Sequence, residues 1–99
     1  MLIQAHLYIK GDVIGVGFRA WTKIQAKIIG VSGWVRNSFD KTERFGSGGG
    51  VEVKIQGEED VVHQMVAVLE KGPPIAHVEE VDVVWEEPNE IYSGFDIRK

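Results

Sequence analysis

A glycine-rich stretch that ends in an arginine is the first feature with chemical potential. Residues 11–19 read Gly-Asp-Val-Ile-Gly-Val-Gly-Phe-Arg, between an alternating run and a helical one. Glycines at 15 and 17 let a backbone approach a ligand, and the Arg19 guanidinium can bind two oxygens of a phosphate or carboxylate at once. Acids usually stand at helix starts, where free N–H groups carry partial positive charge, yet no Asp or Glu occurs between Val13 and Phe39. The pattern predicts an anion receptor; a glycine turn beside a surface arginine is the alternative.

Periodic apolar residues predict the elements that flank this stretch. Residues 3–9 alternate, which is typical of a strand with one face on a core. From residue 18 onward, apolar residues recur at three- and four-residue steps, which predicts a helix that ends near Gly30. The expected apolar stripe of that helix is Phe18, Trp21, Ile24 and Ile28.

The rest of the chain reads as further strands and a second helix. Strands are expected over residues 34–38, 51–55, 81–86 and 95–97. Acids at 58–60 open the second helix, and Gly72-Pro73-Pro74 stops it. Its expected buried side is Val61, Val62, Met65, Val68 and Leu69. The order βαββαβ with a short extra strand predicts a single α+β domain over residues 1–99. Its fold class is a ferredoxin-like α/β sandwich, with two helices on one face of an antiparallel sheet.

Composition excludes several kinds of chemistry. The chain has 99 residues, 43% of them hydrophobic, which suits a single core. It has no cysteine, so thiol catalysis, disulfides and cysteine-based zinc sites are excluded. His6, His63 and His77 lack the spacing of metal ligands, and neither a metal nor a cofactor is expected. No apolar run approaches the roughly 20 residues of a membrane span, so a cytoplasmic protein without membrane contact is expected.

Charge is divided unevenly along the chain. The formal net charge is −4, but residues 1–50 carry seven Lys/Arg against three Asp/Glu, whereas residues 51–99 carry four against twelve. Such asymmetry can focus small anions toward one end of the molecule, whereas nucleic-acid binding requires a broadly basic face. Nucleic acid is therefore not an expected partner. Trp21 and Trp85 are expected in the core. A solvated strand face is expected for the acids Glu79, Glu80, Asp82, Glu86, Glu87 and Glu90.

Two motifs together resemble the acylphosphatase family. The first is Gly11-x-Val13-x-Gly15-Val16-Gly17-Phe18-Arg19, and the second is Gly30-x-x-Gly33-Trp34-Val35-Arg36-Asn37. The likeness continues to Ser93-Gly94-Phe95-x-Ile97-Arg98 and covers nearly the whole chain. The paired motifs are far more specific than either alone. The fold of the family is the ferredoxin-like sandwich already expected from the apolar pattern.

The resemblance implies hydrolysis of acyl phosphates, which are carboxylic–phosphoric anhydrides, to a carboxylate and inorganic phosphate. The family needs neither a metal nor a covalent intermediate. By this likeness Asn37 positions the attacking water, and the phosphate is bound by Arg19 and by loop amides matching the backbone of Gly15, Val16, Gly17, Phe18 and Arg19. Such a sparse site suits an activated leaving group, because a loose phosphoryl transition state mainly needs positioning and charge stabilisation.

The chain departs from the family pattern at two places. Ile14 stands where the family usually has glutamine, which removes a polar side chain from the rim of the loop. Ten residues, Lys41–Gly50, stand where the family commonly has a short turn. A longer surface turn is the favoured interpretation, because long loops cost little. A lid that brings Lys41 and Arg44 to an anionic substrate is the alternative.

Two rival functions remain open. A non-catalytic module could bind a metabolite anion, or RNA on the open sheet, although Tyr8 is the one clear exposed aromatic residue expected there. A larger carbamoyl-transfer maturation protein also resembles the family at its N-terminus, but this chain has 99 residues and no zinc-binding cysteines. A free enzyme is therefore expected, which acts as a monomer on a small-molecule acyl or carbamoyl phosphate.

Overall fold

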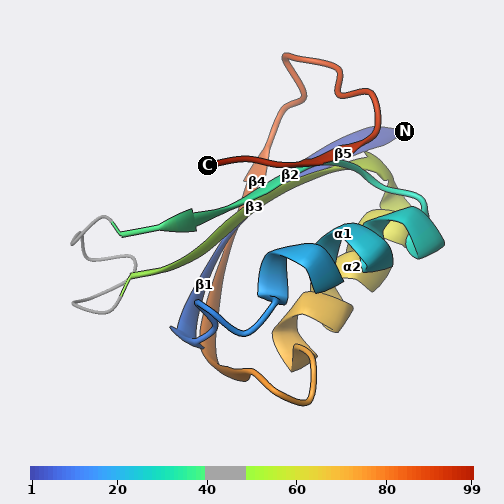
Figure 1. The fold of residues 1–99 in the computed structure, drawn as a ribbon. Coiled ribbons are helices and arrows are strands. Elements are labelled where there is room, and N and C mark those ends of the chain that lie inside the picture. Colours follow the sequence, from blue (N-terminus) through green and yellow to red (C-terminus); the bar gives the residue numbers. More distant parts are fainter. Residues whose placement is uncertain (40–48) are drawn as a thin grey trace.

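The computed structural model describes residues 1–39 and 49–99, in which two helices cover one face of a five-stranded sheet (Figure 1). Along the chain the elements are β1 (Leu2–Asp12), α1 (Phe18–Ile29), β2 (Ser32–Ser38), β3 (Gly50–Glu58), α2 (Glu59–Lys71), β4 (His77–Glu86) and β5 (Phe95–Ile97). The strand order is β4-β1-β3-β2-β5. This is the predicted ferredoxin-like α/β sandwich. Neither helix of the described residues has the length and apolar character needed to cross a membrane.

The C-terminal strand β5 differs from the expected antiparallel pattern. The four longer strands pair antiparallel, whereas β5 runs parallel to β2, with Ile97 opposite Val35. The last residues of β4 and the first residues of β2 lie at the same end of the sheet. A chain that leaves β4, crosses that end of the sheet and turns back must therefore run in the direction of β2. Residues 87–94 make this crossing. The side-chain amide of Gln56 holds them by donating to the Glu90 carbonyl at 2.7 Å.

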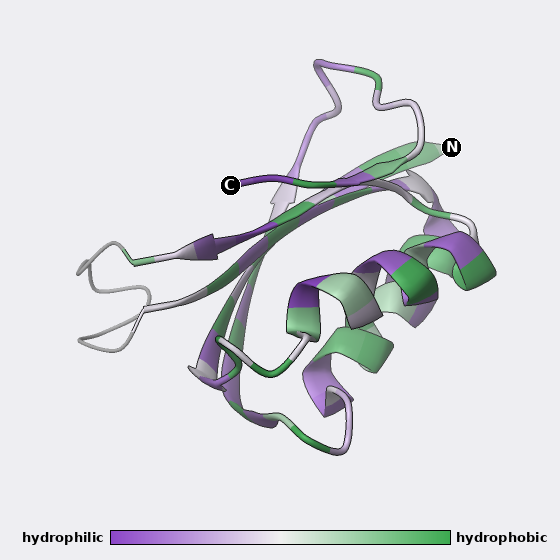
Figure 2. Cartoon of the chain, in the orientation of Figure 1, coloured by the Kyte–Doolittle hydropathy of each residue, from purple (hydrophilic) through white to green (hydrophobic). Residues whose placement is uncertain are grey.

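The core lies between the sheet and the helices. Its central residues on the two middle strands are fully buried: Ala5, Leu7, Ile9, Val51, Val53 and Ile55. The register places Leu7 opposite Val53, so the two strands present one continuous apolar surface. Apolar residues on the helices complete the layer (Figure 2). On α2 the buried residues Val62, Met65 and Leu69 belong to the predicted set.

The predicted apolar stripe of α1 is wrong over much of its length. Phe18 is buried as predicted, but Ile24 is 56% exposed and Ile28 is 73% exposed, and the other buried residues of α1 are Thr22 and Ala26. The buried residues follow one another at four-residue steps, and the small side chains of Thr22 and Ala26 let the helix lie close to the sheet. Thr22 can be buried because its hydroxyl donates to the Phe18 carbonyl at 2.8 Å.

Trp85 is not a core residue, contrary to expectation. It is 50% exposed, and its ring centroid lies 5.0 Å from that of His63 on α2. β4 is an edge strand, so the helices cover only part of it. Trp21 packs beside Phe18 against the core, as predicted, and Trp34 is buried outside the main core cluster.

Glu86 departs from the predicted solvated strand face, while the other five acids of that group are exposed. Glu86 is half-buried, accepts a hydrogen bond from Gln4 at 2.8 Å and lies 3.3 Å from the Lys54 ammonium. Burial opposes ionisation, but the hydrogen bonds from Gln4 and Lys54 outweigh it and hold the pKa of the Glu86 carboxyl below its usual value. An ionised Glu86 therefore neutralises Lys54.

Candidate active site

The glycine loop adopts the backbone that its sequence allows. Gly15 and Gly17 have φ of 80° and 76°, in the left-handed region. A Cβ added at either would meet no atom within 4 Å. Glycine is therefore favoured here by the left-handed backbone conformation and not by crowding. Gly17 is the N-cap of α1 without a side-chain cap, and the first turn holds no acid. The first N–H groups of α1 therefore have no intrahelical partner, which is the arrangement that binds anions at helix starts.

Arg19 lies in the first turn of α1 with its charge uncompensated. Within residues 1–39 and 49–99, its half-buried side chain makes no hydrogen bond and no ion pair. By contrast, Arg36 bonds to Glu52, and Lys54 lies 3.3 Å from Glu86. An unpaired guanidinium beside a helix N-terminus raises the local positive potential, and an anionic ligand would lower it.

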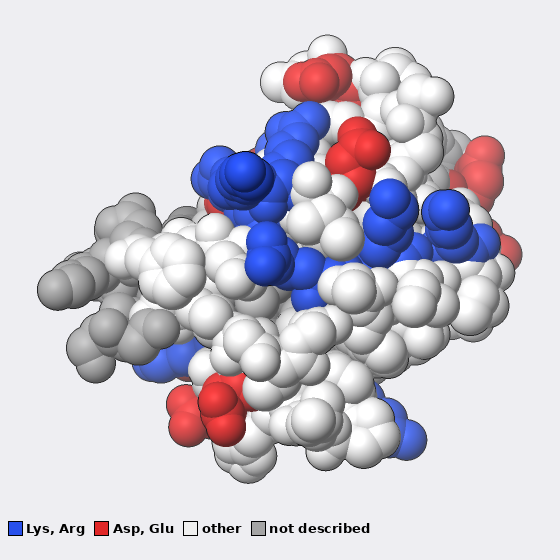
Figure 3. All heavy atoms as spheres, in the orientation of Figure 1, with Lys and Arg blue, Asp and Glu red and all other residues white. Residues whose placement is uncertain are grey.

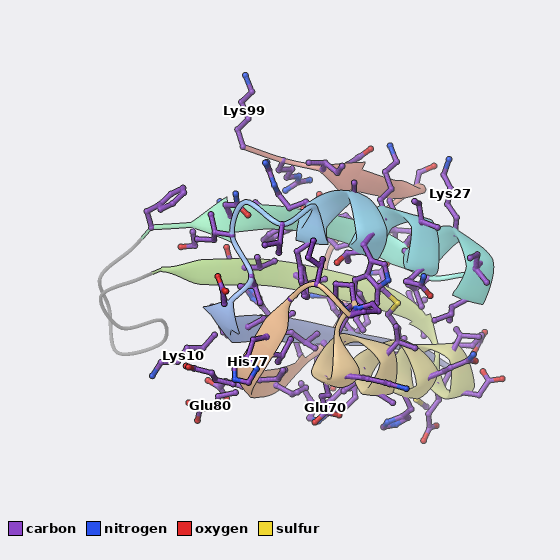
Figure 4. All side chains as sticks on the ribbon, turned by 60° about the horizontal axis from the view of Figure 1, so that its bottom comes forward. Lys10, Lys27, Glu70, His77, Glu80 and Lys99 are labelled. Atoms are coloured by element: carbon purple, nitrogen blue, oxygen red, sulfur yellow. The ribbon has the colours of Figure 1, made fainter. Side chains whose placement is uncertain are left out.

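Further positive side chains surround this helix start. Lys and Arg gather over α1 and the neighbouring strand β5 (Figure 3). Lys23 and Lys27 follow Arg19 at four-residue steps along α1, and Lys27 projects into solvent (Figure 4). In contrast, Lys10 on β1 is paired with Glu80 on β4, 4.0 Å away (Figure 4). The surface beside α1 is therefore positive although the whole chain is acidic.

Strand β2 carries Asn37 on the helix side of the sheet. Val35 points into the core, and strand side chains alternate, so Asn37 shares that side. Gly33 lets β2 approach β3: its φ is 138°, and a Cβ there would lie 1.8 Å from the Lys54 carbonyl oxygen. The Asn37 side chain is half-buried and, in the part of the chain that the structure describes, has no hydrogen-bond partner.

One pocket brings most of the predicted site residues together. It has a volume of about 210 Å³ and is lined by Val13, Gly15, Gly17, Phe18, Arg19, Ala20, Asn37 and Ile97. Of the predicted residues only Val16 is not part of the lining, because its side chain packs against the core. The lining also contains residues that were not predicted as site residues: Val13, Ala20 and Ile97. Ile97 depends on the parallel pairing of β5, which no periodicity reveals.

A second cavity has the opposite character. It measures about 390 Å³ and lies at the β4 edge beside α2, with Glu59, Glu86 and Glu87 in its lining. Carboxylates repel phosphate and acyl phosphates. Of these two pockets, the pocket at Arg19 therefore suits an anion better.

The remaining sequence features do not add groups to the pocket. Ile14 is half-buried and packs against the core, so it is a packing residue rather than a gap in the polar rim. His6 is bound to Glu52, with 2.7 Å between Nε2 and Oε2, and stacks on Tyr8. Across residues 1–39 and 49–99 no group of three His, Cys, Asp or Glu is placed to hold a metal ion. The two alternatives for Lys41–Gly50, a longer surface turn and a lid, depend on residues 41–48, which lie outside the described part of the chain.

Comparison with known proteins decides the family. The acylphosphatase family model matches residues 5–97. The chain is 44% identical over 96 residues to an acylphosphatase of Roseiflexus sp. (strain RS-1), which covers 97% of this chain and 95% of that protein. This chain belongs to the acylphosphatase family. Acylphosphatases are hydrolases that act on acid anhydrides, and membership places this chain among them.

Solved structures agree with the acylphosphatase fold. An acylphosphatase from Coxiella burnetii superposes with a TM-score of 0.84 at 32% identity, over 98% of this chain and 93% of the other. Full-length HypF, solved in its phosphate- and nucleotide-bound form, matches with a TM-score of 0.82 at 25% identity. That match covers all of this chain but 12% of HypF. The same sandwich thus occurs both in acylphosphatases of similar length and inside a much longer protein.

Proposed function

We propose that the chain hydrolyses acyl phosphates in the pocket between the glycine loop, α1 and β2. Family membership gives the reaction class. One observation carries the choice of site: Arg19, unpaired within the described residues, and Asn37 line the same pocket. The proposed substrate is a small molecule, and we expect the protein to act on it as a monomer.

The phosphoryl group is bound where the positive charge is concentrated. Arg19 contacts two of its oxygens, and backbone N–H groups between Gly15 and Arg19 contact the others. These donors lie on a loop with fixed left-handed glycines and on the first turn of a helix. They need little rearrangement as charge shifts in the transition state, which is how preorganised donors lower a barrier.

Asn37 positions the attacking water. Its side-chain oxygen accepts a hydrogen bond from the water and has no useful basicity. The water oxygen bonds to phosphorus while the bond from phosphorus to the acyl oxygen breaks, and that electron pair leaves with the carboxylate. One water proton stays on the attacking oxygen and the other moves to a phosphoryl oxygen, so both end on the phosphate. An acyl phosphate dianion and water thus give a carboxylate and H2PO4−, without a covalent enzyme intermediate.

Hydrolysis of benzoyl phosphate tests the proposal. We expect the purified protein to release inorganic phosphate and benzoate in equal amounts, at the same rate with and without EDTA. Positioning and charge stabilisation are sufficient because the leaving carboxylate is already a good leaving group. Absence of turnover, or activity that EDTA abolishes and a divalent ion restores, would contradict the proposed mechanism.

A further inference from the structure

The pocket has an apolar side that phosphate binding does not use. Arg19, Asn37 and the glycine backbone supply its polar groups. Val13 and Phe18 are each 1% exposed and belong to the core, so they offer little surface to a ligand. Ala20 and Ile97 are the two apolar lining residues with exposed side chains.

The position of Ile97 follows from the pairing of β5. Ile97 lies opposite Val35 on β2, two residues before Asn37. Arg98 alternates to the other side, where its guanidinium carbon lies 5.0 Å from the Trp34 ring centroid. The Ile97 side chain, which is 43% exposed, therefore faces the pocket, although its neighbours in sequence, Asp96 and Arg98, are charged.

The helix side of the pocket continues this apolar surface. Ala20 follows Arg19 directly and is exposed. Ile24, one turn further along α1, is also exposed, so an apolar strip runs from the pocket beside the basic residues Arg19 and Lys23. Exposed isoleucines beside a binding pocket offer contact area to an apolar part of a ligand.

We infer that Ala20 and Ile97 form the subsite for the acyl group, and that it favours alkyl or aryl acyl phosphates over carbamoyl phosphate. This inference rests on the proposed function, because it assumes that Arg19 holds the phosphoryl group. With the phosphoryl group bound there, the acyl group meets Ala20 and Ile97. A carbamoyl amide placed against them would lose its hydrogen bonds to water without gaining a partner, which is unfavourable. A phenyl or alkyl group would be removed from water there, which is favourable.

The experiment compares selectivity in Ile97→Asn and in the wild type. The quantity measured is the ratio of kcat/KM for benzoyl phosphate to kcat/KM for carbamoyl phosphate, because comparison with the wild type cancels the different intrinsic reactivities. We expect this ratio to fall about tenfold in Ile97→Asn, the size typical of losing part of an apolar contact. Ile91→Asn changes another exposed isoleucine, in the segment after β4, and should keep the wild-type ratio.

A second variant keeps the test decisive if Ile97→Asn does not fold. Ala20→Asn changes an exposed helix position, and its ratio should fall in the same direction. A ratio within twofold of the wild type in the folded variants would overturn the acyl subsite while leaving the proposed function intact. A wild-type protein without activity on either substrate would instead contradict the proposed function itself.

Discussion

Arg19 and Asn37 are the two polar side chains of the pocket, and they have different roles in the proposed reaction. Neither has a side-chain partner in residues 1–39 and 49–99. The guanidinium would contact the phosphoryl group in both the ground state and the transition state. The amide would act on the water, which matters only when the new bond to phosphorus forms. Kinetics can therefore separate the two.

We expect Asn37→Ala to lower kcat by about 10²–10³ with little change in KM, because one positioned polar group commonly contributes that much. Arg19→Gln should raise KM and lower kcat together, since it removes binding and transition-state stabilisation alike. Steady-state kinetics with benzoyl phosphate measure both effects. Asn89→Ala, at an exposed asparagine in the segment after β4, is the matched control. A near-normal kcat in Asn37→Ala would rule out the water-positioning role.

At the scale of elements, two glycines place the site for different physical reasons. Gly17 needs a left-handed φ but has open space around it, whereas Gly33 lies against the backbone of β3. Gly17 sets the start of α1. Gly33 sets the distance between β2, which carries Asn37, and the neighbouring strand β3. Conformational strain and steric overlap differ in energy, so the two alanine variants should differ in stability.

We expect Gly17→Ala to lower the free energy of unfolding by about 1 kcal/mol, the penalty of a left-handed conformation for alanine. Gly33→Ala should lower it by more than about 3 kcal/mol or prevent folding, because its Cβ would overlap the Lys54 carbonyl. Urea unfolding followed by circular dichroism measures both. Equal losses in the two variants would show that the close approach of β2 and β3 is not limiting.

The same elements show what the sequence could and could not predict. Alternation in residues 3–9 and the apolar steps of the second helix identified β1 and α2, because each has one buried face. The stripe on α1 failed, because small Ala26 and hydrogen-bonded Thr22 are buried there in place of two isoleucines. Arg19 was predicted from the glycine loop at a helix start and Asn37 from its spacing to Arg19, and both line the same pocket. Ile97 was missed as a site residue, because its place depends on a crossing of the sheet that leaves no local pattern.

At the scale of the whole molecule, the chain is acidic but its positive charge is concentrated near α1. The net charge is −4, and the acids are mostly in the second half of the chain. Those acids lie partly along β4, at the opposite edge of the sheet from β5. The chain also has no acid between Val13 and Phe39, so the helix start at Arg19 has no acid close to it in sequence. This uneven distribution of charge gives an anion a direction of approach.

The most direct measurement is the thermal unfolding midpoint in inorganic phosphate and in chloride at matched ionic strength. Phosphate is the expected product and should bind the native state at Arg19. At 100 times its dissociation constant, one site adds about 2.7 kcal/mol to the free energy of unfolding. Non-specific salt effects also stabilise proteins, so variants must decide.

Arg19→Gln and Arg98→Gln make the same change in net charge, but only Arg19 lines the pocket. We predict that the phosphate-specific rise in the midpoint is strongly reduced in Arg19→Gln and retained in Arg98→Gln. The same rise in Arg19→Gln as in the wild type would place the anion elsewhere and contradict the assignment of this pocket.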